Sequence, residues 1–153
     1  MANIVFNIAK GRVAELYDRV KSNDPANSAI ILIPIETSGL EADSVLIDAD
    51  TVAAVLAGAT NEQSTMGRKT LTDSDLASLP APTDASDYYE VSLPTVTWAA
   101  ATGNAISKIL VCYDSDTTGG ADSAIIPLTM FDFAVTPGGS DIQMTGGAFF
   151  RAS

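Results

Sequence analysis

The residues best suited to bind a ligand are three aspartates of one loop, Asp114, Asp116 and Asp122. Asp114, Asp116 and Gly119 match the D-x-D-x-x-G opening of an EF-hand loop, whose carboxylates coordinate calcium. The terminal bidentate glutamate of that motif is absent, and the sequence predicts no helix on either side of the loop. Two interpretations stay open: a solvated hairpin tip, or a site for a hard cation that oxygens of a neighbouring subunit complete.

The residues needed for most enzyme mechanisms are missing. The chain contains no histidine, which excludes Ser-His-Asp and Cys-His catalysis and histidine-based zinc sites. Its one cysteine, Cys112, lies in the apolar run Ile109–Tyr113, so we expect a buried, inert thiol and no internal disulfide. No glycine pair is followed by the G-K-S/T of a phosphate-binding loop. We therefore predict a protein without enzymatic activity and without a cofactor.

The aspartate loop must be positioned by the two apolar runs that flank it. These runs, Ile109–Tyr113 and Ala124–Leu128, predict two antiparallel core strands. Similar runs predict further short strands at 3–8, 28–36, 68–71, 88–93, 141–144 and 148–151, allow one at 42–47, and let 130–135 either extend the second core strand or begin another. Because Pro34 cannot donate a ladder hydrogen bond, its end of the 28–36 strand should be an edge or a bulge. We expect Trp98, which follows another short run, to lie in the core.

Helical periodicity appears near the start of the chain. Apolar residues spaced i, i+3, i+4 and i+7 predict a helix from about Arg12 to Lys21, and these residues are Val13, Leu16, Tyr17 and Val20. A second helix is predicted around 52–57, with Asp48 or Asp50 as its N-cap. Thr72 and Asp75 resemble a capping box, with room for one helical turn before Pro80.

These elements predict one domain over residues 1–153. The fold class is α+β and β-dominated: an antiparallel sandwich or partly open barrel of about seven to nine short strands, with two helices in the N-terminal third. Segment 79–87 contains two prolines and two aspartates, and we interpret it as a surface loop within this domain. No period of about 20–50 residues repeats, so solenoids and propellers are excluded.

Charge is distributed unevenly along the chain. The net charge is −11, which argues against nucleic-acid binding because phosphate contacts need clustered Lys and Arg. Arg12, Arg19 and Lys21 belong to a short N-terminal stretch that is basic overall. This stretch is either a mixed-charge helix on an acidic body or a surface that docks an acidic partner or a neighbouring copy. No apolar run reaches the length of about 18–20 residues that spans a bilayer, so we expect no membrane partner.

Three long stretches of the chain carry a family resemblance. They read KGRVAELYDRVKSNDPANSAIILIPIETSGLEADSVLIDADTVAAVLAG, KTLTDSDL and KILVCYDSDTTGGADSAIIPLTMFDFAVTPGGSDI. Together with the closing GGAFFRAS, they make most of the chain similar to a group of small virion proteins of tailed bacteriophages. The resemblance includes no catalytic motif, and it implies a structural role in the particle.

From this resemblance we expect a capsid decoration (cement) protein that stabilises the phage head. The expected partners are other virion proteins, the major capsid protein first, and further copies of the chain; the expected location is the virion, assembled in the host cytoplasm. The residues expected to contact partners lie on the basic helix and at the closing strand AFFRAS, whose edge suits pairing between copies. They are Arg12, Arg19, Lys21, Phe149, Phe150 and Arg151.

Two alternatives stay open. The first is a tail, collar or head–tail adaptor component, which would use the same kind of contact surface. The second is a host- or carbohydrate-binding module that uses Tyr88, Tyr89 and Trp98, with calcium near Asp114 and Asp116.

Overall fold

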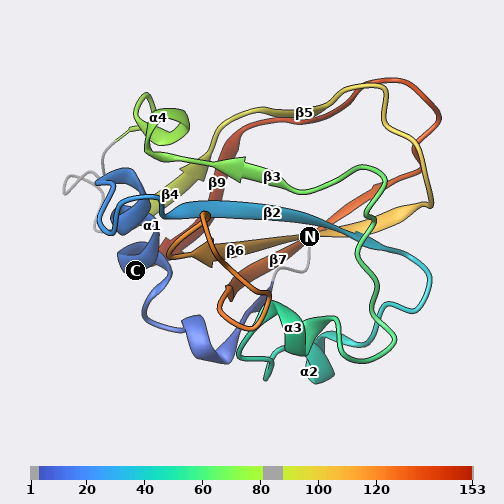
Figure 1. The fold of residues 1–153 in the computed structure, drawn as a ribbon, viewed down its shortest axis with the longest axis horizontal. Coiled ribbons are helices and arrows are strands. Elements are labelled where there is room, and N and C mark those ends of the chain that lie inside the picture. Colours follow the sequence, from blue (N-terminus) through green and yellow to red (C-terminus); the bar gives the residue numbers. More distant parts are fainter. Residues whose placement is uncertain (1–3, 81–87, 153) are drawn as a thin grey trace.

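The computed structural model describes residues 4–80 and 88–152, in which nine strands form antiparallel sheets and four short α-helices surround them (Figure 1). The prediction of a β-dominated α+β fold is confirmed, and the main sheet does not close into a barrel. The strands are β1 Ile4–Val5, β2 Ala29–Glu36, β3 Lys69–Leu71, β4 Tyr89–Leu93, β5 Val96–Trp98, β6 Ile106–Asp114, β7 Ile126–Val135, β8 Ile142–Met144 and β9 Gly147–Ala152. The helices are α1 Val13–Lys21, α2 Asp43–Leu46, α3 Val52–Val55 and α4 Asp73–Leu76, with a 3-10 helix η1 at Asn7–Ala9.

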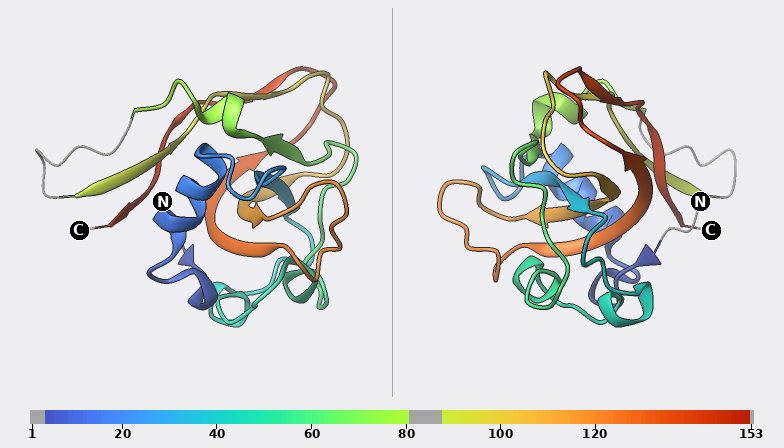
Figure 2. Two further views of the ribbon diagram at one scale, coloured as in Figure 1. Left: turned by 60° about the vertical axis from the view of Figure 1, so that its left-hand side comes forward. Right: turned by 90° about the vertical axis from the view of Figure 1, so that its right-hand side faces the viewer.

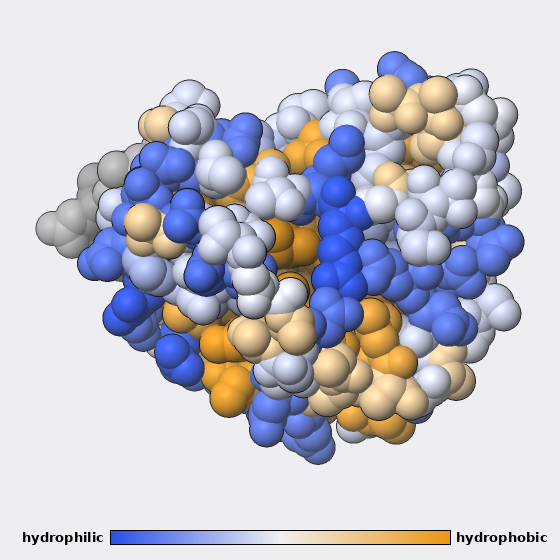
Figure 3. Space-filling view, viewed as in Figure 1, coloured by the Kyte–Doolittle hydropathy of each residue, from blue (hydrophilic) through white to orange (hydrophobic). Residues whose placement is uncertain are grey.

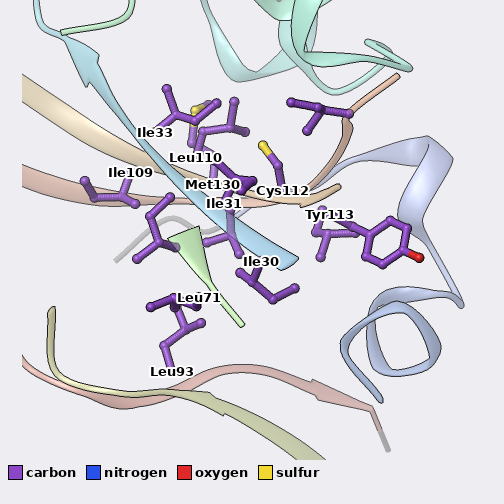
Figure 4. Close-up of a cluster of buried hydrophobic side chains, with 14 of the residues drawn as sticks. Ile30, Ile31, Ile33, Leu71, Leu93, Ile109, Leu110, Cys112, Tyr113 and Met130 are labelled. Carbon is purple, nitrogen blue, oxygen red and sulfur yellow. The ribbon is translucent and has the colours of Figure 1, made fainter. Parts of the chain in front are cut away.

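The main sheet has the strand order β1-β7-β6-β2-β3. The predicted pair of core strands is therefore confirmed, and β2 covers the second edge of β6. Val111 of β6 lies opposite Leu32 on one side and Thr129 on the other. Figure 4 shows how side chains of β2, β6 and β7 fill the core, with Leu93 reaching them from the opposite layer.

The remaining strands form a two-stranded ribbon. β4 pairs with β9, and β5 pairs with β8, so two long antiparallel segments run together with one break. At that break a Cβ on Gly146 would lie 2.7 Å from the Thr95 nitrogen, which explains why glycine stands there. Figure 2 shows the ribbon along one side of the main sheet, with its β4/β9 end extending beyond the body.

Trp98 fixes the ribbon to the rest of the core. It is 2% exposed, and its indole Nε1 donates to the Gly67 carbonyl at 2.9 Å. Its ring lies 6.5 Å from that of Phe133 on β7. The prediction of a core tryptophan is confirmed. The predicted irregularity near Pro34 is confirmed too, because the pairing of β2 with β6 shifts register between Ile35 and Glu36.

Three local predictions are wrong. Segment 42–47 forms α2 instead of a strand, because Leu46 points into the core while Val45 is 59% exposed. The N-cap of α3 is Thr51, whose hydroxyl accepts from the Ala54 amide, and neither Asp48 nor Asp50 caps it. The strand predicted at 3–8 ends at Val5, and η1 follows it.

The capping box of α4 is confirmed, since the Thr72 amide donates to Asp75 Oδ2 at 2.8 Å. The loop predicted at 79–87 lies outside the described residues, apart from Leu79 and Pro80.

Candidate interaction surface

Asp122 of the aspartate loop is held by an arginine. Arg68, just before β3, donates from Nη1 and Nη2 to the two Asp122 carboxylate oxygens at 2.6 and 3.0 Å. The same guanidinium donates from Nε and Nη2 to Glu62 at 2.8 and 2.5 Å. These hydrogen bonds lower the pKa of the Asp122 carboxyl and raise that of Arg68. Asp122 therefore ties the loop to β3 and is already neutralised by a cation.

Asp114 and Asp116 shape the loop through its own backbone. Asp114 is 6% exposed, and its Oδ1 accepts from the Asp116 amide at 3.0 Å. Asp116 in turn accepts from the amide of Thr118 at 3.0 Å and from its hydroxyl at 2.5 Å. Such side-chain-to-backbone bonds are typical of tight turns. Within the described residues, no three acidic or cysteine side chains are grouped closely enough to hold a metal ion.

Helix α1 carries the predicted cations on its outer face. Arg12 and Arg19 both lie close to Glu15, at 3.8 and 3.1 Å, in pairs spaced three and four residues apart. Both arginines are about half exposed, so these pairs leave them accessible. Lys21 is bound within the chain, because its Nζ donates to the carbonyls of Leu79 and Pro80 at 2.8 and 3.4 Å.

Two tyrosines join α1 to the ribbon. Tyr17 is buried beneath the helix, and its hydroxyl donates to the Ser92 carbonyl on β4 at 2.8 Å. Burial, with Asp18 next to it, raises the pKa of Tyr17 to about 12. From β4, the Tyr89 hydroxyl donates to the Asp18 carboxylate, and burial together with this bond raises the pKa of Tyr89. One hydrogen bond therefore runs from the helix to the ribbon, and a second runs from the ribbon to the helix.

The closing strand β9 lies beside α1. The Phe149 ring is 6.1 Å from the Tyr17 ring, and Phe149 and Phe150 are both half-buried against the core. The register of β9 against β4 shifts at Phe149, and neither phenylalanine is fully buried. Arg151 pairs with Glu90 at 2.7 Å and lies over the Tyr88 ring at 3.8 Å.

The structure thus places the two predicted partner-binding segments next to each other, in contact through Tyr17 and Phe149. Arg12 and Arg19 lie on α1, and Phe149, Phe150 and Arg151 follow on the neighbouring strand. β9 pairs with β4 along one edge, and the described residues supply no strand to its other edge. Exposed cations beside an open strand edge suit contact with an acidic surface and main-chain pairing.

A carbohydrate platform is not assembled from the three aromatic candidates. Trp98 is buried, Tyr89 is engaged with Asp18, and Tyr88 is covered by Arg151. Cys112 is fully buried as predicted, and this burial raises the pKa of its thiol well above its usual value.

Sequence reasoning missed the contacts that hold these parts together. The pair of Arg68 with Asp122 joins residues 54 positions apart, and a pattern within one element cannot show such a contact. One signal was available for Lys108, a charge inside an apolar strand, which predicts a buried partner. It pairs with Asp43 and Asp132 at 3.0 and 3.1 Å.

Comparison with known protein families, with curated proteins and with solved structures gave no match for this chain. Among the helices of the described residues, none combines the length and the apolar character needed to cross a bilayer.

The Arg68 cluster predicts a loss of stability when its cation is removed. Arg68→Met leaves Glu62 and Asp122 without their shared cation, and we expect the free energy of unfolding to fall by about 2 kcal/mol. Lys69→Met, one residue further along, is the matched control and should cost less than about 1 kcal/mol. Urea unfolding measures both; equal effects would contradict the role given to Arg68.

The same cluster predicts an acid dependence. Because Arg68 lowers the pKa of folded Asp122, its stabilisation is present above the unfolded value of about 3.9 and is lost as pH falls through the folded pKa. Asp122→Asn should therefore flatten the fall in stability below about pH 4. If urea unfolding at several pH values shows the same fall in stability below about pH 4 in the variant as in wild type, this assignment is wrong.

The tyrosine contacts predict an alkaline dependence. The raised pKa values of Tyr17 and Tyr89 mean that the unfolded chain loses these protons first, near pH 10, so stability falls as pH rises from there through the folded pKa. Tyr89→Phe should lower the free energy of unfolding at pH 7 by about 1 kcal/mol and flatten the alkaline fall. Tyr88→Phe is the matched control, since it keeps the ring under Arg151. An equal effect of both substitutions on urea unfolding would argue against the Tyr89–Asp18 bond.

Proposed function

We propose that this chain is a non-enzymatic structural protein of a tailed-phage virion, and specifically a capsid decoration protein that stabilises the head. The observation that carries the proposal is the contact between α1 and β9 through Tyr17 and Phe149. It joins the basic helix and the closing strand, the segments through which the resemblance to small virion proteins leads us to expect contact. On this proposal, the major capsid protein supplies an acidic face and a segment that adds to the open edge of β9.

The character of the fold supports a role based on contact. The loop carboxylates are used to build turns and to bind Arg68, and the thiol is buried, so the described residues offer few groups free for chemistry. Tyr17 and Tyr89 hold the helix and the ribbon in a fixed relation. A fixed relation between a helix and a strand edge reduces the entropy lost when a partner binds.

Rebinding to stripped heads tests the proposal. Heads of the encoding phage are depleted of this protein, purified wild-type protein is added back, and binding is measured by co-sedimentation. We expect saturable binding that Arg19→Glu and Arg151→Glu each weaken by about tenfold, because a rim charge is inverted. Lys69→Glu makes the same charge change on β3 and should change binding by less than about twofold.

Failure of the wild-type protein to rebind would contradict a decoration role. Equal losses in all three variants would contradict the assigned surface while leaving the role intact. Calcium-dependent binding to host glycans, with no binding to heads, would favour the host-binding alternative.

A further inference from the structure

A second surface lies where η1 meets the turn between α2 and α3. The Asn7 amide donates to the Ile47 carbonyl at 2.9 Å, and the Asn7 side-chain amide donates to Asp48. Figures 1 and 2 show these short helices together at the lower edge of the molecule, away from the β4/β9 end of the ribbon. We call this surface the lower face and define it by Ile8, Lys10, Val45, Asp48 and Asp50.

The lower face presents positive and negative side chains. Lys10 follows η1 and is exposed; among the described residues it is the one cation without an ion pair, a side-chain hydrogen bond or an aromatic contact. Asp48 and Asp50 are exposed on the neighbouring turn. They belong to stretch 23–67, which contains seven acidic residues and neither lysine nor arginine. The unused positive charge therefore borders the most uniformly acidic part of the chain.

The same face also exposes apolar surface. Val45 is 59% exposed, and no other large hydrophobic residue in the described parts of the chain is as open to solvent. Ile8 on η1 and Ile47 at the end of α2 are half-buried. Figure 3 shows apolar patches along this lower edge, separated by hydrophilic atoms. Apolar area next to charged groups is common in protein–protein contacts.

We propose that the lower face pairs two copies of the chain about a two-fold axis. A two-fold interface is formed by the same patch on both partners, so the patch must complement itself. With Lys10 beside Asp48 and Asp50, rotation of one copy lets each lysine meet the acidic turn of the other, while the Val45 side chains lose water between them. A purely acidic partner would meet Asp48 and Asp50, and a purely basic one would meet Lys10.

The net charge of the chain strengthens the choice of a second copy. At −11, two copies repel each other over most orientations, so association requires a face where opposite charges meet. Such pairing is weak and decreases with salt, because exposed ion pairs are screened. The inference concerns the chain itself and holds whether or not the protein decorates a capsid.

Sedimentation velocity of the full chain, as a function of concentration and salt, tests the proposal. Wild type should form a dimer that dissociates at high salt. Lys10→Glu alone and Asp50→Lys alone should each weaken dimerisation by about tenfold, because like charges then meet at both ends of the interface. An equimolar mixture of these two variants should dimerise like wild type, since the glutamate introduced in one copy then meets the lysine introduced in the other.

Two further variants separate loss of pairing from loss of fold. Val45→Asp changes an exposed side chain and should abolish the dimer while near-ultraviolet circular dichroism stays unchanged. Lys69→Glu changes the charge by the same amount as Lys10→Glu, but on β3, away from this face. It should leave the dimer intact. A wild type that stays monomeric at low salt would overturn the proposal, as would a closed ring of three or more copies or a variant mixture that stays monomeric.

Discussion

The placement of β6 between β2 and β7 is the constraint on which the rest of the structure depends. Eight of the nine residues of β6 are buried, and its two neighbours satisfy its backbone groups on both edges. Burying side chains such as Leu110 and Val111 contributes about 1.5–3 kcal/mol each, more than an exposed ion pair such as Arg19–Glu15 contributes. The sheet must then be covered on both faces, and the helices and the ribbon do so.

Helix α1, the ribbon and the aspartate loop are attached to this central sheet by a few polar contacts. Tyr17 and Tyr89 fix α1 against β4, and the Trp98 indole fixes the other part of the ribbon to the loop before β3. Arg68 fastens the aspartate loop. The loop that looked most like a ligand site is thus part of the scaffold, whereas the helix and the closing strand, which the sequence favours for partner contact, lie next to each other.

The sequence predicts the parts of this fold that depend on local pattern. The strand pair around the aspartate loop, helix α1, the capping box at Thr72 and the buried Trp98 all follow from periodicity or from local side-chain chemistry. The strand prediction for segment 42–47 is wrong because so short an apolar run fits a strand and a single helical turn equally well. Only the packing of Leu46 in the core decides between the two.

The candidate surface was predicted in its pieces and not as a whole. Charge and aromatic type selected Arg19 and Phe149, but the proximity of α1 to β9 depends on the contact of Tyr17 with Phe149 across the fold. The role of Lys21 was missed, because a lysine that binds backbone carbonyls of a distant loop has the same sequence pattern as an exposed one. The same limit applies to Asp122, whose partner Arg68 lies 54 positions away.

The central claim is that this chain works by contact, as a decoration protein on the phage head. Quantitative mass spectrometry of purified virions, with the major capsid protein as internal standard, tests it most directly. A decoration role predicts copy numbers in the hundreds, scaling with the capsid lattice. Six, twelve or a few dozen copies would contradict it and would place the protein in the tail or collar.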